Sequence, residues 1–310
     1  MGVAECVSCK DKYERYTNQD ETNIRIVKYI NILNTIGNAY MVHNEDNSIL
    51  TFSNDMNIRL LKYDIFEDDY YIDYVLPNQQ PLNVISSVCL FEDNCILIGY
   101  ETGELKLFDI NEKHFDYSGY CHKSKIKKII HLYYDEFITI SDETNIKVWS
   151  KYNFSLKREY YQESIVNDLI LFNNYIGITS GMKKDLYIWN FQTISKPKKI
   201  DLDFNVKNMC YIENEVLLTS GNSIYKMNIG NNSINLIINI DNQILNILPL
   251  SDKTMIIVIY QCLLHLDTNY KIIAKIDNNE LGNIIGIFNI INDRKFIIGD
   301  NCGRLYLYKY

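Results

Sequence analysis

The side chains best suited to chemistry are the cysteines and histidines, and their closest pairing lies at the amino terminus. Cys6 and Cys9 form a C-x-x-C. A structural zinc site needs four ligands, usually completed by a second such pair or by two closely spaced histidines, and the sequence has neither. The five histidines are isolated, and eight cysteines in a long chain without a secretory signal are expected to be reduced thiols. We therefore expect no metal site, no cofactor and no disulfide framework.

Nucleophile and phosphate-binding motifs are absent from the sequence. It contains no G-x-S-x-G, no P-loop and no H-E-x-x-H. Runs of carboxylates such as Glu67-Asp68-Asp69 are typical of solvated loops. We expect the chain not to be an enzyme and not to take a small-molecule substrate.

The first six residues, Met1-Gly2-Val3-Ala4-Glu5-Cys6, resemble an N-myristoylation signal, although Cys6 stands where Ser or Thr is usual. Cys6 and Cys9 beside an acylated Gly2 resemble S-palmitoylation acceptors. One acyl chain gives marginal membrane binding and a second makes it stable, which suits a chain that an anionic leaflet would repel. We expect lipidation at Gly2, Cys6 and Cys9, with residues 1–23 as a flexible tether to the cytoplasmic face of a membrane. The alternative is an unmodified, disordered terminus.

The composition limits the class of protein. The chain has 310 residues, 47% of them apolar, and 31 basic against 39 acidic side chains give a net charge of -8. That apolar fraction excludes a mostly disordered chain, and the acidic balance argues against nucleic acid as a partner. No apolar run approaches the ~18 residues of a membrane-spanning helix. We expect a cytoplasmic protein.

One phrase recurs along the whole chain: an apolar run, a short polar turn, and an alternating run that ends in a large residue. The third copy runs from Phe137 to Trp149. The final large residues of the seven copies are separated by 38 to 47 positions, at 61, 108, 149, 189, 227, 266 and 308. Each phrase is short, rich in Ile, Val, Tyr and Thr, and bounded by Gly, Asn or Asp, which predicts a β-hairpin. A further apolar run precedes most hairpins, so the sequence predicts an all-β repeat of about 40 residues.

This strand and hairpin pattern resembles the WD40 repeat. The third unit carries the best match, with Cys121-His122 at the family's Gly-His position, Ser141 at its serine and Trp149 at its tryptophan. The resemblance implies a seven-bladed β-propeller in which His122, Ser141 and Trp149 belong to a buried hydrogen-bonded chain, with Asp142 or Glu143 near the family's aspartate. No unit of this chain has Trp-Asp.

Closure of the ring requires an outer strand for the last unit. After Tyr308 two residues remain, so the seventh unit lacks that strand, and residues 24–30 can supply it. A closed ring protects sheet edges from pairing with other chains. We expect one domain over residues 24–310, closed by its amino-terminal strand.

Three charged segments are ambiguous. Lys123, Lys125 and Lys127 would lie on one side of a strand by alternation, where they could meet an acidic partner or phosphate, or form a solvated rim. Residues 196–199 are predicted to form a solvated loop between blades. Residues 68–74 are predicted to form an outer strand whose tyrosines pack on the sheet.

The WD40 resemblance implies that other proteins dock on the face that carries the loops before each first strand and between the second and third strands. In this sequence the positions are Tyr100, Glu101, Lys123, Lys125, Asp142, Glu143, Met182 and Lys183. We expect a non-catalytic scaffold in a complex with other proteins. The alternatives are a phosphoinositide-binding propeller, which usually carries Arg-Arg, and a ubiquitin-ligase substrate receptor, which usually carries Trp-Asp-x-Arg; neither motif occurs here.

Overall fold

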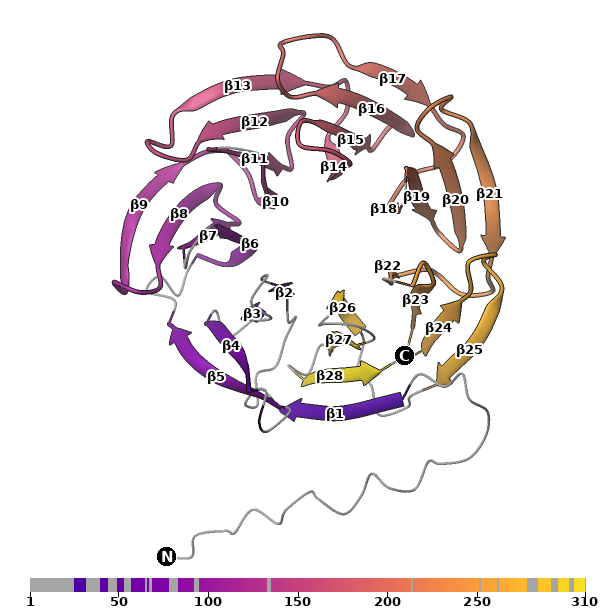
Figure 1. Cartoon of the computed structure of the whole chain (residues 1–310). Helices are drawn as coiled ribbons and strands as arrows, with labels where there is room; N and C mark the ends of the chain where they lie inside the picture. Colours follow the sequence, from indigo (N-terminus) through magenta and orange to yellow (C-terminus); the bar gives the residue numbers. More distant parts are fainter. Residues whose placement is uncertain are drawn as a thin grey trace, which may run out of the picture.

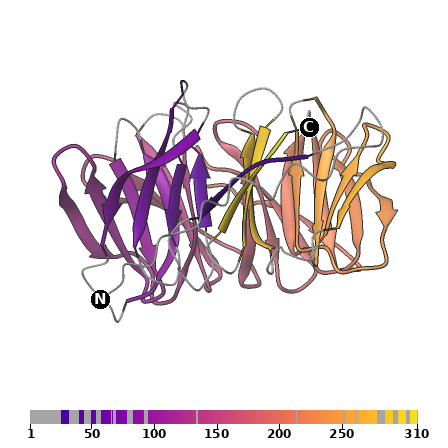
Figure 2. The same ribbon diagram turned by 90° about the horizontal axis from the view of Figure 1, so that it is seen from below.

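The computed structural model is a ring of seven antiparallel sheets of four strands each (Figure 1). It describes residues 25–31, 40–43, 49–52, 57–64, 66, 69–77, 83–91, 95–132, 135–212, 214–250, 252–260, 262–277, 284–290, 295–300 and 304–309. The side view in Figure 2 shows the sheets standing side by side across the thickness of the ring. This architecture confirms the predicted seven-bladed all-β fold.

Sheets 1 to 6 are meanders whose first strand lies nearest the axis of the ring, and in sheet 7 the innermost strand is β26 (Figure 1). Sheet 1 is β2 (Tyr40–His43), β3 (Ile49–Phe52), β4 (Ile58–Asp64) and β5 (Asp69–Leu76). Sheet 2 is β6 (Ile85–Phe91), β7 (Cys95–Tyr100), β8 (Glu104–Asp109) and β9 (His114–Tyr120). Sheet 3 is β10 (Ile126–His131), β11 (Glu136–Ser141), β12 (Asn145–Ser150) and β13 (Leu156–Tyr161). Sheet 4 is β14 (Val166–Leu171), β15 (Ile176–Gly181), β16 (Asp185–Asn190) and β17 (Lys198–Asp201).

The remaining sheets complete the circle. Sheet 5 is β18 (Asn208–Ile212), β19 (Glu215–Ser220), β20 (Ser223–Asn228) and β21 (Ile234–Asn239). Sheet 6 is β22 (Asn246–Pro249), β23 (Met255–Ile259), β24 (Cys262–Leu266) and β25 (Ile272–Asp277). Sheet 7 combines β26 (Ile284–Ile290), β27 (Lys295–Asp300) and β28 (Arg304–Lys309) with β1 (Arg25–Asn31).

Burial explains why the middle strands read as apolar runs and the outer strands alternate. Every residue of β23 is buried, because both faces of this strand pack against neighbouring sheets. The outer strand β9 instead alternates regularly between exposed and partly buried residues. The apolar clusters join successive sheets: one combines Ile138 of sheet 3 with Trp189 of sheet 4, and another combines Leu217 of sheet 5 with Ile257 of sheet 6. The core is therefore a series of layers between sheets.

Polar contacts near the axis also join successive sheets. The innermost strands of sheets 2, 3 and 4 each have a β-bulge after their first residue. The bulged side chain donates a hydrogen bond to the backbone carbonyl of the residue that begins the next sheet's inner segment. The three pairs are Ser86 Oγ to Ile126 O at 2.7 Å, Lys127 Nζ to Val166 O at 2.8 Å and Asn167 Nδ2 to Val206 O at 2.5 Å. The same hydrogen bond between neighbouring sheets thus recurs about every 40 residues, together with the strand pattern.

A glycine is required where sheet 2 meets sheet 3. Gly103 lies in the β7–β8 turn with φ +82°, and its carbonyl accepts hydrogen bonds from the backbone N–H groups of Cys121 and His122. A Cβ at Gly103 would lie 2.1 Å from the carbonyl oxygen of His122. Both the backbone angle and this close approach therefore exclude a side chain.

The amino-terminal strand closes the last sheet as predicted. β1 pairs antiparallel with β28, with Tyr29 opposite Tyr306 and Ile30 opposite Leu305. The observed bounds, Arg25–Asn31, lie one residue later than the expected strand. On the inner side of the ring, β2 of sheet 1 contacts β26 of sheet 7. The two ends of the chain are thus joined by backbone pairing.

The structure confirms the prediction for one of the segments that were ambiguous in the sequence and corrects the prediction for another. The tyrosine-rich segment forms the outer strand β5, as expected, and Tyr74 stacks on Phe108 of sheet 2. The prediction of a loop at residues 196–199 is wrong for Lys198 and Lys199, which begin the outer strand β17. Lysines are compatible with an edge strand because their charge opposes pairing with another chain.

Removing the closing strand tests the domain boundary. We expect deletion of residues 1–31 to lower the melting temperature by more than about 10 °C or to abolish cooperative unfolding, because β28 then becomes an unpaired edge. Deletion of residues 1–23 should change it by less than about 2 °C, since β1 is kept. Differential scanning calorimetry measures both, and equal melting of the two truncations would contradict the role of β1.

Candidate functional site

The ring presents two loop faces. Because consecutive strands of each sheet are antiparallel, their connections alternate between the two ends of the sheet. Face A carries the connections into each first strand and those from the second to the third strand. Face B carries the connections from the first to the second strand and from the third to the fourth. All eight predicted interaction positions lie on, or at the end of a strand leading to, face A of sheets 2, 3 and 4.

One of these positions cannot contact a partner. Tyr100 is 2% exposed and belongs to the apolar cluster between sheets 1 and 2, with the Lys106 ammonium 5.3 Å from its ring centroid. Its assignment to the interaction face is therefore wrong. The residue ends β7, a strand buried on both sides, so its side chain follows the pattern of the strand rather than that of the turn.

The charged positions of face A hold one another. Lys125 Nζ pairs with Glu101 Oε1 of sheet 2 at 2.9 Å, and Lys127 Nζ pairs with Asp142 Oδ1 at 2.8 Å. Glu143 accepts a hydrogen bond from the backbone N–H of Lys123 at 2.6 Å. These loops are thus cross-connected between sheets. The charges of these two ion pairs are compensated within the protein.

The β-bulge in β10 overturns the expected alternation of the lysines. Lys125 reaches back to sheet 2, whereas Lys127 and Lys128 reach forward to sheet 4. Lys128 Nζ lies 2.8 Å from both Asp168 Oδ1 and the carbonyl oxygen of Leu169. The bulge adds a residue to the strand, so side chains beyond it change sides. These cations connect neighbouring sheets and do not form one surface.

A buried hydrogen-bonded chain lies beneath the face A loops of sheet 3. Trp149 Nε1 donates to Thr139 Oγ1 at 2.8 Å, and Thr139 Oγ1 lies 2.7 Å from His122 Nε2. His122 Nδ1 lies 3.0 Å from Ser141 Oγ and 3.5 Å from Glu143 Oε2. The structure thus places His122, Ser141 and Trp149 in one chain, with Glu143 at its exposed end. Thr139, which links the histidine to the tryptophan, is a residue that the sequence analysis missed.

The chain indicates a neutral His122. If the hydroxyl of Thr139 donates to Nε2, the proton of the imidazole lies on Nδ1, where Ser141 and Glu143 can accept it. Burial, with a smaller contribution from the Lys147 ammonium, lowers the pKa of His122 to about 4 although Glu143 opposes the shift. Protonation would therefore disrupt this part of the fold.

Sheet 4 builds a shorter chain without histidine. Trp189 Nε1 donates to Thr179 Oγ1 at 2.8 Å, and Thr179 Oγ1 donates to Gln162 Oε1 at 2.7 Å. Gly181 stands where sheet 3 has Ser141, and a Cβ there would lie 2.0 Å from Ser164 Oγ. The amide nitrogen of Gln162 accordingly has no hydrogen-bond partner among the described residues. A threonine ten positions before each tryptophan was the signal that could have revealed both chains.

Exposed apolar side chains gather beside these loops. Met182, a predicted position, is 61% exposed in the β15–β16 turn, and its backbone N–H bonds to the carbonyl of Ile165, which is also exposed. Ile165 was not identified from the sequence, because it begins an apolar run that predicted a buried strand. Ile165, Met182 and the exposed Lys183 form what we call the Met182 patch.

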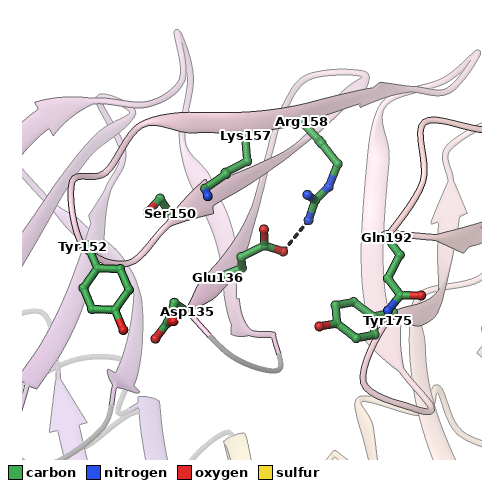
Figure 3. A pocket seen from close by; sticks show the side chains of 8 residues that line it. All are labelled: Asp135, Glu136, Ser150, Tyr152, Lys157, Arg158, Tyr175 and Gln192. Carbon is green, nitrogen blue, oxygen red and sulfur yellow. Dashed lines mark hydrogen bonds and ion pairs between the residues drawn. The ribbon is translucent and has the colours of Figure 1, made fainter.

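Face B has a hollow of about 340 Å³ between sheets 3 and 4 (Figure 3). Glu136, at the start of β11, forms an ion pair with Arg158 of β13. Tyr152 lies beside Asp135 on one side, and Tyr175 faces them from sheet 4. The lining residues are Asp135, Glu136, Ser150, Tyr152, Lys157, Arg158, Tyr175 and Gln192.

Two buried thiols of the described residues are held in the protonated form. Burial raises the pKa of Cys89 and of Cys121 to about 12, so neither is a thiolate at neutral pH. No group of three metal-ligating side chains occurs in the described part of the chain. Within the same residues no helix has the length and apolarity to span a membrane. Gly2, Cys6 and Cys9 lie outside the described residues.

Comparison with known proteins establishes the architecture. No family model and no curated protein matches the sequence. Among solved structures 1721 chains match. One of them, in the crystal structure of a mitotic checkpoint complex, is 9% identical with a TM-score of 0.77 over 99% of this chain and 98% of that one. The protein therefore has the fold of a seven-bladed β-propeller. So widespread a fold does not by itself identify a function.

The buried histidine predicts a pH dependence of stability that substitution of His122 should remove. The pKa of His122 is about 4 in the folded protein against 6.5 for the free side chain, so the unfolded state binds the proton first and stability falls as pH drops through this range. We expect the wild-type protein to lose about 2 kcal/mol more than His122→Gln between pH 7 and pH 5. Gln162 shows that an amide fits the equivalent position.

Urea unfolding at the two pH values measures this difference. His265, whose pKa burial also lowers, is present in both proteins and cancels in the comparison. Equal pH dependence of the two proteins would show that His122 is not the titrating group.

Proposed function

We propose that the protein is a non-catalytic scaffold on which other proteins dock, and that they dock on face A at the Met182 patch. The observation that carries the proposal is the exposure of Met182 and Ile165 on the face A loops of sheet 4. The neighbouring face A loops of sheets 2 and 3 carry ion pairs that are already formed. Exposed apolar groups on a rigid support gain most from desolvation by a partner, whereas paired charges add orientation at little cost.

Two further observations support a docking role. The similar solved chain, to which only the fold relates this protein, belongs to a multiprotein complex. The face A loops are held by hydrogen bonds between sheets, as from Val166 N to the carbonyl of Glu143. A preformed surface binds without the entropy cost of ordering loops.

Substitution in the patch tests this proposal. We expect Met182→Asp to lower the recovery of co-purifying proteins by about tenfold, because it places a charge where apolar area would be buried. Leu236→Asp is the matched control, since Leu236 is 56% exposed on the outer strand β21 of sheet 5, away from both proposed contact sites. Quantitative mass spectrometry of isotope-labelled pull-downs measures both, and equal recovery with Met182→Asp and wild type would overturn the choice of face.

We further propose that acylation at Gly2, with Cys6 and Cys9 as second acceptors, tethers this scaffold to the cytoplasmic face of a membrane. Two acyl chains would offset the repulsion between a chain of net charge -8 and an anionic leaflet. Intact-mass analysis of the native amino terminus should find an acylated Gly2. Gly2→Ala should move the protein from the membrane fraction to the supernatant, and unchanged partition would remove the tether from the proposal.

A further inference from the structure

The hollow on face B has an imbalance between its hydrogen-bond donors and acceptors. Each of its carboxylates has a neighbouring donor: Glu136 pairs with Arg158, and Asp135 lies beside Tyr152 and raises the pKa of its hydroxyl. Lys157, in contrast, has no carboxylate partner within the described part of the chain. Arg158 Nε is buried and lacks an acceptor among the described residues. The groups of the hollow that still lack a hydrogen-bond or ion-pair partner are therefore the donors of Lys157 and Arg158.

The outer strand of the neighbouring sheet divides its lysines between two sides. Lys199 lies opposite Tyr187, on the side of β17 toward sheet 3, and pairs with Glu163 at 2.6 Å. Lys198 lies opposite Ile188, on the side toward sheet 5. The segment that follows Gln192, in the wall of the hollow, carries the exposed Lys196, which pairs with no carboxylate of the described residues. Lys157 therefore keeps an uncompensated charge on a protein whose net charge is -8.

Lys157 is held in place by the backbone of its strand. It is the extra residue of a β-bulge in β13, between Arg158, opposite Val148, and Leu156, opposite Trp149. A bulge fixes the direction of a side chain that regular alternation would turn elsewhere. Figure 3 shows its ammonium group directed into the hollow from the β13 side.

We propose that this hollow binds an acidic side chain, an Asp or Glu in a segment of a partner protein, with Lys157 as the principal counter-charge. A volume of about 340 Å³ is at the lower end for ligand sites and suits one side chain with its backbone. Tyr152, 76% exposed, and Tyr175 provide aromatic walls for the aliphatic part of that side chain.

The same charges disfavour a nucleic acid. A polyanion would bring several phosphates against Asp135 and Glu136, and against a surface of net negative charge. A single carboxylate meets the cations without that repulsion. The inference rests on the proposed docking function but concerns the opposite face from the Met182 patch, so the two can fail separately.

A labelled hexaglutamate peptide provides the probe. Fluorescence anisotropy with the full-length protein at low salt should show saturable binding that weakens as salt is added. We expect Lys157→Met to weaken this binding about fivefold, the effect of losing one exposed charge pair. Lys271→Met is the matched control: Lys271 is exposed on face B of sheet 6, and its removal should leave the affinity unchanged.

Three results would overturn the proposal. The first is no saturable binding up to about 1 mM, because a weaker affinity does not indicate recognition. The second is an equal loss of affinity with Lys271→Met, which would indicate attraction without a site, and the third is tighter binding of a hexauridylate of the same length. Circular dichroism of the Lys157 variant checks that it is folded. Met182→Asp should bind hexaglutamate as wild type does, so a failure at the hollow is distinguishable from a failure of the docking proposal.

Discussion

The structure depends on contact between successive sheets. No sheet of four strands can bury both of its faces alone, so each relies on the apolar layers shared with its two neighbours. Near the axis the bulged side chains of Ser86, Lys127 and Asn167 add a directional bond from each sheet to the next. A series of this kind is complete when its last member meets its first. The contacts between the other sheets therefore depend on the pairing of β1 with β28.

The fold could be predicted from the sequence because a strand that is buried on both faces has a continuous run of apolar residues. A strand such as β23 must be apolar throughout, and its recurrence at about 40 residues is visible without coordinates. Outer strands have a less distinctive sequence pattern, because one of their faces is exposed to solvent. The tyrosines of β5 identified it, but the lysines of β17 were interpreted as a loop because an edge strand can carry charge on its exposed positions.

The site was less predictable, since its residues are defined by neighbours distant in sequence. Thr139 is unremarkable in a strand, and its role arises from Trp149 on one side and His122 of the preceding connection on the other. Tyr100 was misplaced for the opposite reason: its position beside a turn suggested exposure, but the adjoining sheet covers it. A β-bulge, which no local pattern announced, decided which sheet Lys127 contacts.

The two faces differ in the interactions left for a partner. On face A the pairs Lys125–Glu101 and Lys127–Asp142 compensate charges of sheets 2 and 3, so association at the proposed patch would draw mainly on apolar area and depend weakly on salt. On face B the uncompensated Lys157 would favour electrostatic attraction, which salt screens. Because apolar and electrostatic attraction respond differently to ionic strength, salt would separate the two proposed contacts.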